Sequence, residues 1–213
     1  MKKALFALCL TAVAAQASAS LVFSDRNTWV AAVTGMKTVN FEGLTSANSV
    51  VSEGASKTID NVAFTSPSGS MYVIGQNYAE SGGTFGFGTG ATLFSYAPGV
   101  HGTLPDASNA FAINLRGYLE STTQFTLLFS DGESFNISAN NPSGAFFGAI
   151  LNNAITGFTV QTSSRFLAID NVSFANANAT SRVPEPSALA LVAVALAGLT
   201  LAGRRRQRKG TQA

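Results

Sequence analysis

One carboxylate stands out in an alternating stretch near the end of the chain. Asp170 belongs to a run of residues spaced by two, which would lie on one face of a strand. Apart from Asp170 that face is apolar, and a buried carboxylate without a partner costs several kcal/mol. We therefore expect Asp170 to meet a cation, an arginine or several N–H donors. The residues of this face are Phe166, Ala168, Asp170, Val172 and Phe174.

A second aspartate occurs in nearly the same sequence context. Residues Ile59–Phe64 read Ile-Asp-Asn-Val-Ala-Phe, and residues Ile169–Phe174 read Ile-Asp-Asn-Val-Ser-Phe. Two copies are too few for a solenoid. The repetition instead predicts two strands with similar roles in one sandwich, with Asp60 in the same setting as Asp170.

The residue types that perform hydrolysis do not converge in this sequence. His101 is the only histidine, and we expect it in a Pro/Gly loop without a nucleophile-elbow motif. Asp131 and Glu133 flank a tight turn, where solvated carboxylates are common. Cys9, the only cysteine, lies in the leading apolar segment, so the domain has no thiolate chemistry. We therefore expect that the protein is not an enzyme.

Aromatic residues offer a different kind of site. A sugar-stacking platform would need several of them on one surface. The alternative is that they are ordinary core and surface residues. The candidates are Trp29, Tyr72, Tyr78, Tyr96 and Tyr118.

The elements that would position these residues are mostly strands. A short helix is expected over residues 27–33, with Ser24 or Asp25 as its N-cap and with Trp29 in its buried stripe. The Asp131-Gly132 pair between two alternating runs predicts a hairpin. The other expected strands are 38–42, 57–65, 70–75, 91–96, 111–119, 145–150, 155–162 and 165–174.

Many short strands separated by turn signals predict an all-β domain, a β-sandwich with a jelly-roll topology rather than an immunoglobulin-like one. Only 11% of the residues are charged. Residues 20–181 contain five basic and ten acidic residues, a net charge of −5, which argues against nucleic acid as a partner.

The first 19 residues have the three parts of a secretory signal peptide. Lys2 and Lys3 form the positive region, Ala4–Val13 the apolar region, and Ala17-Ser18-Ala19 the small residues before cleavage. The sandwich domain is then expected over residues 20–175. A polar linker would follow over residues 176–182.

The C-terminal segment, residues 183–213, has a sorting pattern of its own. Pro184-Glu185-Pro186 precedes an uncharged apolar run over residues 188–202, and basic residues follow over 204–209. The run is short for a transmembrane helix, but snorkelling arginines extend its reach. The basic cluster predicts a cytoplasmic C-terminus. Its first members, which would stop transfer through the membrane, are Arg204, Arg205 and Arg206.

This order of motif, apolar helix and arginine cluster resembles the PEP-CTERM sorting signal. The resemblance implies recognition by an exosortase, transient anchoring in the inner membrane and removal of the tail. It also implies delivery to the cell surface or extracellular matrix, in a context of exopolysaccharide and biofilm.

The domain also resembles the exported domain found ahead of such tails. The residues that carry this resemblance are Phe41-Glu42-Gly43-Leu44, Phe146-Phe147-Gly148 and Phe166–Phe174. That domain is similar to carbohydrate-binding-module jelly rolls, which often hold a structural Ca²⁺. The resemblance implies Glu42 and Asp170 as calcium ligands, and Asp60 as a weaker candidate. The alternative is that Asp170 pins a strand end through backbone hydrogen bonds.

These patterns favour an exported, non-catalytic protein with a structural or adhesive role in the matrix. A carbohydrate-binding module for exopolysaccharide is the alternative, and a hydrolase is disfavoured. An exposed aromatic row on one sheet face would favour carbohydrate binding, and a pocket with paired carboxylates would favour hydrolysis.

Overall fold

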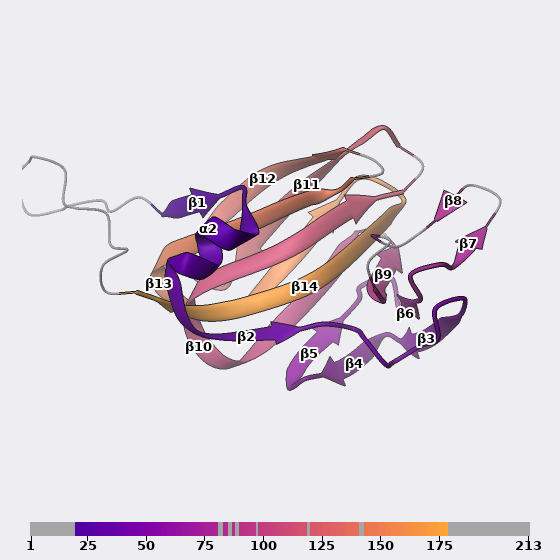
Figure 1. Ribbon diagram of the computed structural model, residues 1–213, viewed down its shortest axis with the longest axis horizontal. Helices are drawn as coiled ribbons and strands as arrows, with labels where there is room; N and C mark the ends of the chain where they lie inside the picture. The colour runs from indigo at the N-terminus through magenta and orange to yellow at the C-terminus, as the bar shows by residue number, and fades with distance from the viewer. Residues whose placement is uncertain are drawn as a thin grey trace, which may run out of the picture. The chain divides into compact units, whose positions relative to one another are not determined.

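The computed structural model describes residues 20–178, apart from 81–82, 85–86, 88–89, 97, 119 and 141–142. The expected signal peptide and sorting tail lie outside these residues. Ala19–Ser181 form one compact unit, built from strands and one short helix (Figure 1). No helix in the described part of the chain is long and apolar enough to cross a membrane.

The helix is α2 (Arg26–Ala31). The strands are β1 (Leu21–Phe23), β2 (Val33–Val39), β3 (Val50–Gly54), β4 (Ser56–Ile59), β5 (Val62–Thr65), β6 (Met71–Ile74), β7 (Ala79–Glu80), β8 (Gly83–Thr84), β9 (Thr92–Tyr96), β10 (Gly99–Gly117), β11 (Thr122–Phe129), β12 (Ser134–Asn140), β13 (Ala145–Thr162) and β14 (Phe166–Ala177).

Two long strands, β10 and β13, join the layers of the sandwich. The first part of β10, residues 99–103, pairs with β5 and with residues 157–161 of β13. Its last part, residues 110–117, pairs with β14 and with the beginning of β13. The register shifts between these parts, at Thr103–Ser108 and at Ser108–Ala110. Such irregularities let a strand pass from one sheet layer to the other.

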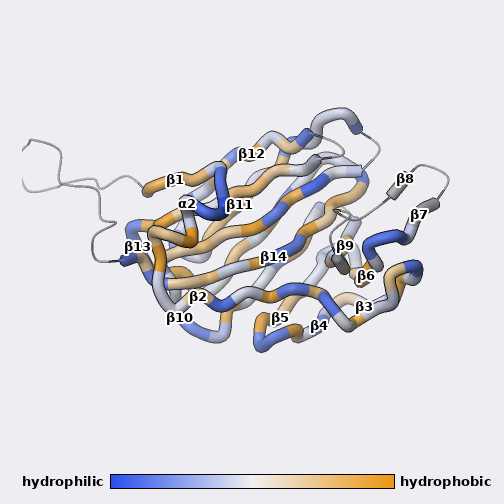
Figure 2. Tube along the Cα trace, in the orientation of Figure 1, coloured by the Kyte–Doolittle hydropathy of each residue, from blue (hydrophilic) through white to orange (hydrophobic). Residues whose placement is uncertain are grey.

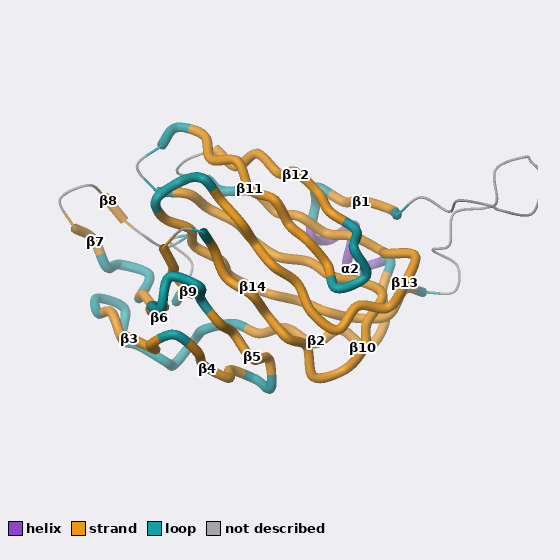
Figure 3. The backbone as a smooth tube through the Cα atoms, turned by 180° about the vertical axis from the view of Figure 1, so that it is seen from behind, coloured by secondary structure: helices purple, strands orange, loops and turns teal. Residues whose placement is uncertain are grey.

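We call the two layers first and second. The first contains β1, β2, β3, β6, β9, β14, the beginning of β13 and the end of β10. The second contains β4, β5, β11, β12, the end of β13 and the beginning of β10. All pairings are antiparallel, and the expected β-sandwich is confirmed. Figure 3 shows the hairpin strands of the second layer from behind.

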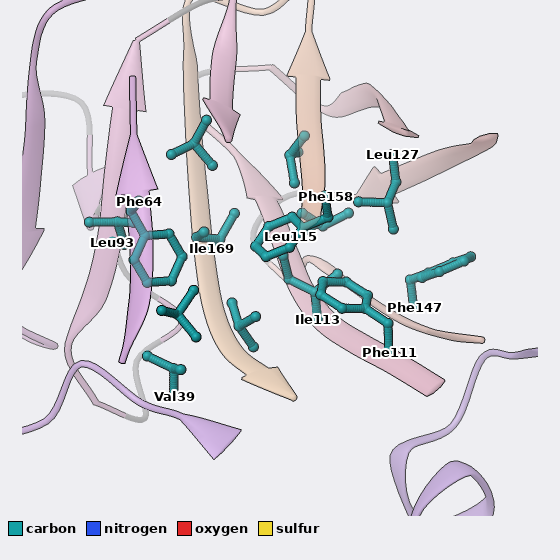
Figure 4. Close-up of a cluster of buried hydrophobic side chains, with 14 of the residues drawn as sticks. Val39, Phe64, Leu93, Phe111, Ile113, Leu115, Leu127, Phe147, Phe158 and Ile169 are labelled. Carbon is teal, nitrogen blue, oxygen red and sulfur yellow. The ribbon is translucent and has the colours of Figure 1, made fainter. Parts of the chain in front are cut away.

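The main core fills the space between the layers. Hydrophobic and hydrophilic residues alternate along the strands (Figure 2), so each strand turns one row of side chains inward. Phe111 from the first layer meets Phe158 from the second at a ring-centroid distance of 4.7 Å, and Phe158 also meets Phe64 at 6.4 Å. Figure 4 shows these side chains directed toward one another from both layers. The two layers are therefore held together by a single aromatic and aliphatic core.

Replacing Phe158 by alanine should remove about 3–5 kcal/mol of unfolding free energy, because a fully buried ring would leave a cavity between the layers. Urea unfolding measures the change. Leu128→Ala is the matched control, since Leu128 points outward from β11 and is 39% exposed. A loss from Phe158→Ala no larger than that from Leu128→Ala would contradict this account of the core.

Helix α2 covers the outer side of the first layer. Asp25 is its N-cap, as expected, and accepts hydrogen bonds from the backbone N–H and hydroxyl of Thr28, both at 2.8 Å. Trp29 is fully buried and donates from Nε1 to the carbonyl of Ala149 at 3.2 Å. It packs with Val33, with alanines of β10 and β14 and with Ile150 of β13 in a second hydrophobic cluster.

Candidate binding face

The last strand contains a bulge that changes the side to which its residues point. Asn171 has a left-handed backbone, with φ of 51°, and the register slips by one residue at this point. Asp170 pairs with Asn114, on the outer face of the first layer. Beyond the bulge, Val172 and Phe174 point into the main core. The expectation that Asp170 shares one face with these two residues is therefore wrong.

Asp170 is nevertheless buried, with only 3% of its surface exposed. Its two oxygens accept hydrogen bonds from Asn171, from the backbone N–H at 2.6 Å and from the side-chain amide at 2.8 Å. Burial raises the pKa of the Asp170 carboxyl from 3.8 to about 6. The Glu42 carboxylate raises this pKa further, whereas the Asn171 N–H and Arg26 lower it. The expected N–H donors are present, but they do not offset burial.

Arg26 on α2 connects the helix to this region, and sequence reasoning missed it. Its guanidinium donates to the Asn171 carbonyl at 3.0 Å, to the Ser173 hydroxyl at 3.1 Å and to Asn114 Oδ1 at 3.4 Å. Burial lowers the pKa of Arg26, and the charge of Asp170 opposes that effect. These partners lie 88 to 147 residues away along the chain, so no local pattern could have revealed them.

The calcium ligands implied by the sequence resemblance are only partly brought together. Glu42 is exposed, lies close enough to Asp170 to raise its pKa, and accepts a hydrogen bond from the Ala91 N–H at 3.0 Å. Two neighbouring carboxylates, one of them buried, fit a Ca²⁺ ion because a dication would relieve both repulsion and burial. Among the described residues, no three His, Cys, Asp or Glu side chains form a metal-binding group.

Asp60 lies elsewhere, and its expected setting is wrong. It is exposed, and with Asn61 it makes the two-residue turn between β4 and β5. Both residues have left-handed backbones, with φ of 48° and 65°. Residues 57–65 are thus a hairpin of the second layer rather than one strand. Of the three calcium ligands that the sequence resemblance implies, only Glu42 in the β2–β3 loop and Asp170 in β14 are therefore neighbours.

A group of aromatic side chains covers the outer face of the first layer beside Asp170. We call this group, formed by β6, β9, β14 and the end of β10, the aromatic face. The ring of Phe166 is its centre, at centroid distances of 5.3 Å from Tyr96, 5.4 Å from Phe94 and 5.7 Å from Tyr118. Tyr72 meets Tyr96 edge-on at 6.0 Å. Tyr78 and Phe87 pack against the same cluster.

The aromatic face includes four of the five candidates for a sugar-stacking platform, Tyr72, Tyr78, Tyr96 and Tyr118. Tyr72, Tyr78 and Tyr96 are partly exposed, whereas Tyr118 is only 8% exposed. Trp29 does not belong to the group, because it is fully buried beneath α2. Phe94 and Phe166 were missed, although their alternation with Leu93 and Leu167 was visible in the sequence.

The residues discounted for catalysis have structural contacts. His101 lies in β10 rather than in a loop, and its ring nitrogens contact the hydroxyls of Thr159 at 3.0 Å and Thr103 at 3.3 Å. Asp131 accepts a hydrogen bond from the Glu133 N–H at 3.0 Å within the β11–β12 turn. Glu133 accepts hydrogen bonds from Ser20 at 2.5 Å and Asn152 at 3.4 Å.

The comparison with protein families concerns the C-terminal tail. Residues 182–206 match the family model described as the PEP-CTERM protein-sorting motif, and the match spans both Pro184-Glu185-Pro186 and Arg204–Arg206. The chain carries a PEP-CTERM sorting motif. This motif implies export and anchoring in the membrane through the C-terminal tail. A search of curated proteins finds no match.

Solved structures similar to the domain ahead of the PEP-CTERM motif are β-rich modules. One is the C-terminal family 22 carbohydrate-binding module of Clostridium thermocellum Xyn10B, with 14% identity, 70% of this chain and 96% of that chain covered, and a TM-score of 0.38. Another is the K1 cleaved adhesin domain of Lys-gingipain from Porphyromonas gingivalis, with 9% identity, 62% and 100% coverage, and a TM-score of 0.35. Similarity at this level says nothing about ligand or activity.

Proposed function

We propose that the domain is a non-catalytic polysaccharide-binding module that an exosortase releases to the cell surface or the extracellular matrix. The observation that carries this proposal is the aromatic face. Its central rings, Phe94, Phe166 and Tyr118, are buried, and the partly exposed rings of Tyr72, Tyr78 and Tyr96 pack against them, so these tyrosines provide the apolar surface on which a ring-shaped ligand would stack. Sugar rings have such apolar faces, and the tyrosine hydroxyls add hydrogen-bonding groups.

The polar groups beside the aromatic face support a bound sugar rather than a purely apolar ligand. Arg116 on β10 is directly opposite Ala168 in the register, between the aromatic residues and Asp170, and is itself only 7% exposed. Asn114 and Asn171 follow along the same face. Ligand sites typically combine an apolar surface with a few placed polar groups, which fix orientation.

A non-catalytic role is supported by how the acidic residues are used. Asp131 accepts a hydrogen bond within the β11–β12 turn, and Glu133 accepts one from Ser20 near the N-terminus. Asp170 is buried and accepts hydrogen bonds from Asn171. A glycosidase needs two carboxyl groups on opposite sides of one glycosidic bond. We therefore assign the domain a structural or adhesive role in a polysaccharide matrix, including biofilm.

Before processing, the protein would be held in the inner membrane with its C-terminus in the cytoplasm. The apolar run over residues 188–202 and the basic residues after it support this orientation. The signal peptide over residues 1–19 would deliver the domain to the other side. The exosortase and the membrane are then transient partners, and the matrix polysaccharide is the lasting one.

Replacing Tyr72 or Tyr96 by alanine should weaken binding to the host's exopolysaccharide at least tenfold, or about 1.4 kcal/mol, because each change removes a stacking ring. Titration calorimetry with the purified protein measures the affinity. Met36→Ala is the control, because Met36 is an apolar residue on β2 that is 43% exposed and outside the aromatic face. Near-ultraviolet circular dichroism checks that each variant is folded. Wild-type affinity in both tyrosine variants would refute the aromatic face as the site.

A further inference from the structure

The part of the second layer formed by β12, β11 and the end of β13 differs from most protein surfaces in having no charged side chain. The three adjacent strands β12, β11 and β13 contain no Asp, Glu, Lys or Arg at any position. Their outward residues are hydroxyl and amide side chains, with Leu128 as the large apolar exception. We call the central outward residues the polar face: Gln124, Thr126, Asn136, Ser138, Thr159 and Gln161.

Hydrogen bonds between neighbouring strands hold these side chains in place. Gln124 donates to the Ser138 hydroxyl at 2.9 Å, and Thr126 donates to Asn136 Oδ1 at 3.1 Å. Gln161 lies directly opposite Thr126 on the other side, so one row of polar groups crosses three strands. Neighbouring strands are about 4.8 Å apart, and successive outward residues are about 6.7 Å apart along a strand. The polar face is therefore an ordered grid.

Each group in this grid has more hydrogen-bonding capacity than these contacts use. An amide side chain has two N–H donors and a carbonyl with two lone pairs, and a hydroxyl both donates and accepts. The Gln124–Ser138 contact uses one amide proton, and the Thr126–Asn136 contact uses one lone pair. The Thr159 hydroxyl contacts a ring nitrogen of His101 at 3.0 Å, and the remaining capacity belongs mainly to the exposed side chains of Gln124, Asn136, Ser138 and Gln161.

The absence of charged side chains from these three strands argues for some classes of partner and against others. Nucleic acids and anionic lipid surfaces are bound by Lys and Arg, which these three strands lack. Protein interfaces have cores enriched in aromatic residues, Met and Arg, which are also missing from the polar face. A neutral polysaccharide carries many hydroxyls and no charge. Its hydroxyls pair with amides and hydroxyls in either direction, and no ionised group has to lose its water.

We propose that the polar face is a second polysaccharide-docking surface, specific for neutral glycans. It lies on the outer side of the second layer, whereas the aromatic face lies on the outer side of the first. One domain would then bind two polysaccharide chains on its opposite layers. The bridging of chains rests on the proposed function of the aromatic face, whereas binding to the polar face does not.

Exchanging amides for carboxylates tests the polar face with little change of shape. The variant Gln124→Glu with Gln161→Glu replaces two amides by hydrated charges, and the control Asn27→Asp with Asn176→Asp adds the same charge to exposed positions in α2 and β14. The probes are immobilised cellulose, starch, xylan and mannan, which are neutral, and polygalacturonate, which is acidic. We expect the purified wild type to bind a neutral probe more tightly than polygalacturonate, and the polar-face variant to lose at least tenfold in affinity for that probe.

Agglutination of probe particles separates this proposal from the proposed function. Wild type and control should agglutinate the particles, whereas the polar-face variant and the tyrosine variants should not. If the tyrosine variants agglutinate like wild type but the polar-face variant binds poorly, the aromatic face fails and the polar face stands. Wild-type affinity of the polar-face variant, or no retention of wild type on any neutral probe, would overturn the proposal.

Discussion

Replacing Asp170 by asparagine should stabilise the metal-free protein at neutral pH, by at most about 3 kcal/mol. A substitution of a buried polar residue usually lowers the free energy of unfolding, so an increase is unusual. The reason is that Asp170 is only 3% exposed, with a pKa raised to about 6 mainly by burial. Asparagine keeps the shape of the protonated carboxyl and avoids the cost of a buried charge.

The pH dependence of stability follows from the same shift. The pKa of Asp170 in the folded protein, about 6, lies above its ordinary value of 3.8, so the folded state holds this proton more tightly. The stability that protonation contributes is fully present below about pH 4 and is lost as the pH rises through about 6. Urea unfolding in chelator should therefore show a loss for wild type across this window, and none from this group in Asp170→Asn.

Asp106→Asn is the control for removing a carboxylate, because Asp106 is exposed and its ion pair with Lys37 lies at the surface. It should change the stability at neutral pH far less than Asp170→Asn does, because an exposed ion pair contributes little. Equal stability of wild type and Asp170→Asn in chelator at pH 4 and at pH 7 would show that the Asp170 charge is compensated.

Bound Ca²⁺ should reverse the effect of the substitution on stability, so that wild type becomes more stable than Asp170→Asn. If Glu42 and Asp170 hold the ion, wild type should gain about 2.7 kcal/mol at a hundredfold excess of Ca²⁺ over its dissociation constant. Asp170→Asn should lose this gain, and Glu42→Gln should reduce it. Thermal melts with Ca²⁺ and with chelator measure the effect. A wild-type melting temperature that is the same in both would exclude the ion and leave the Asp170 charge only partly offset, by the hydrogen bonds from Asn171 and by Arg26.

The fold class was predictable because strand periodicity is local. Alternation located β6, β9 and β14 to within a few residues, the Asp131-Gly132 pair located the β11–β12 hairpin, and Asp25 located the start of α2. The continuity of β10 was not predictable, because Pro98, Gly99 and Pro105 read as loop residues. Pro105 is nevertheless in a strand, near the register shift where β10 passes between layers.

The face on which Asp170 lies was harder to predict, because the bulge at Asn171 reverses the side to which all later residues of β14 point. Asp60-Asn61 and Asp170-Asn171 have the same local sequence, and both asparagines adopt a left-handed backbone. In one copy this backbone closes a hairpin, and in the other it makes a bulge inside a strand. Sequence alone cannot choose between the two, because the strand that pairs with Asp170 is β10, and its residue Asn114 lies far away in the chain. The sequence therefore identified Asp170 correctly as buried and as sharing a face with Phe166 and Ala168, but it wrongly placed Val172 and Phe174 on that face.

Replacing Pro184 and Glu185 by alanine should leave export intact and trap the protein in the inner membrane. We expect export to depend on the signal peptide over residues 1–19, which this change does not touch. Retention follows because the run over residues 188–202 is uncharged, and because moving the basic cluster that begins at Arg204 through the bilayer is too costly. Removal of the tail is then the only way to release the domain, so released protein should fall from nearly all to nearly none. Fractionation of host cells measures this change.

The mature protein from wild-type cells should correspondingly lack Ala188–Ala213, which mass spectrometry detects as the loss of the whole arginine cluster. Ser181→Ala is the control, because Ser181 lies directly before the matched residues 182–206 and the variant should be processed normally. From the sequence, we expect the two prolines to favour an extended backbone, which would leave this triplet accessible to an enzyme at the membrane surface. Secreted wild-type protein that still contains Arg204–Lys209 would show that the tail is not removed. Release of the Pro184→Ala, Glu185→Ala protein at the wild-type level would show that the triplet is not what the enzyme recognises.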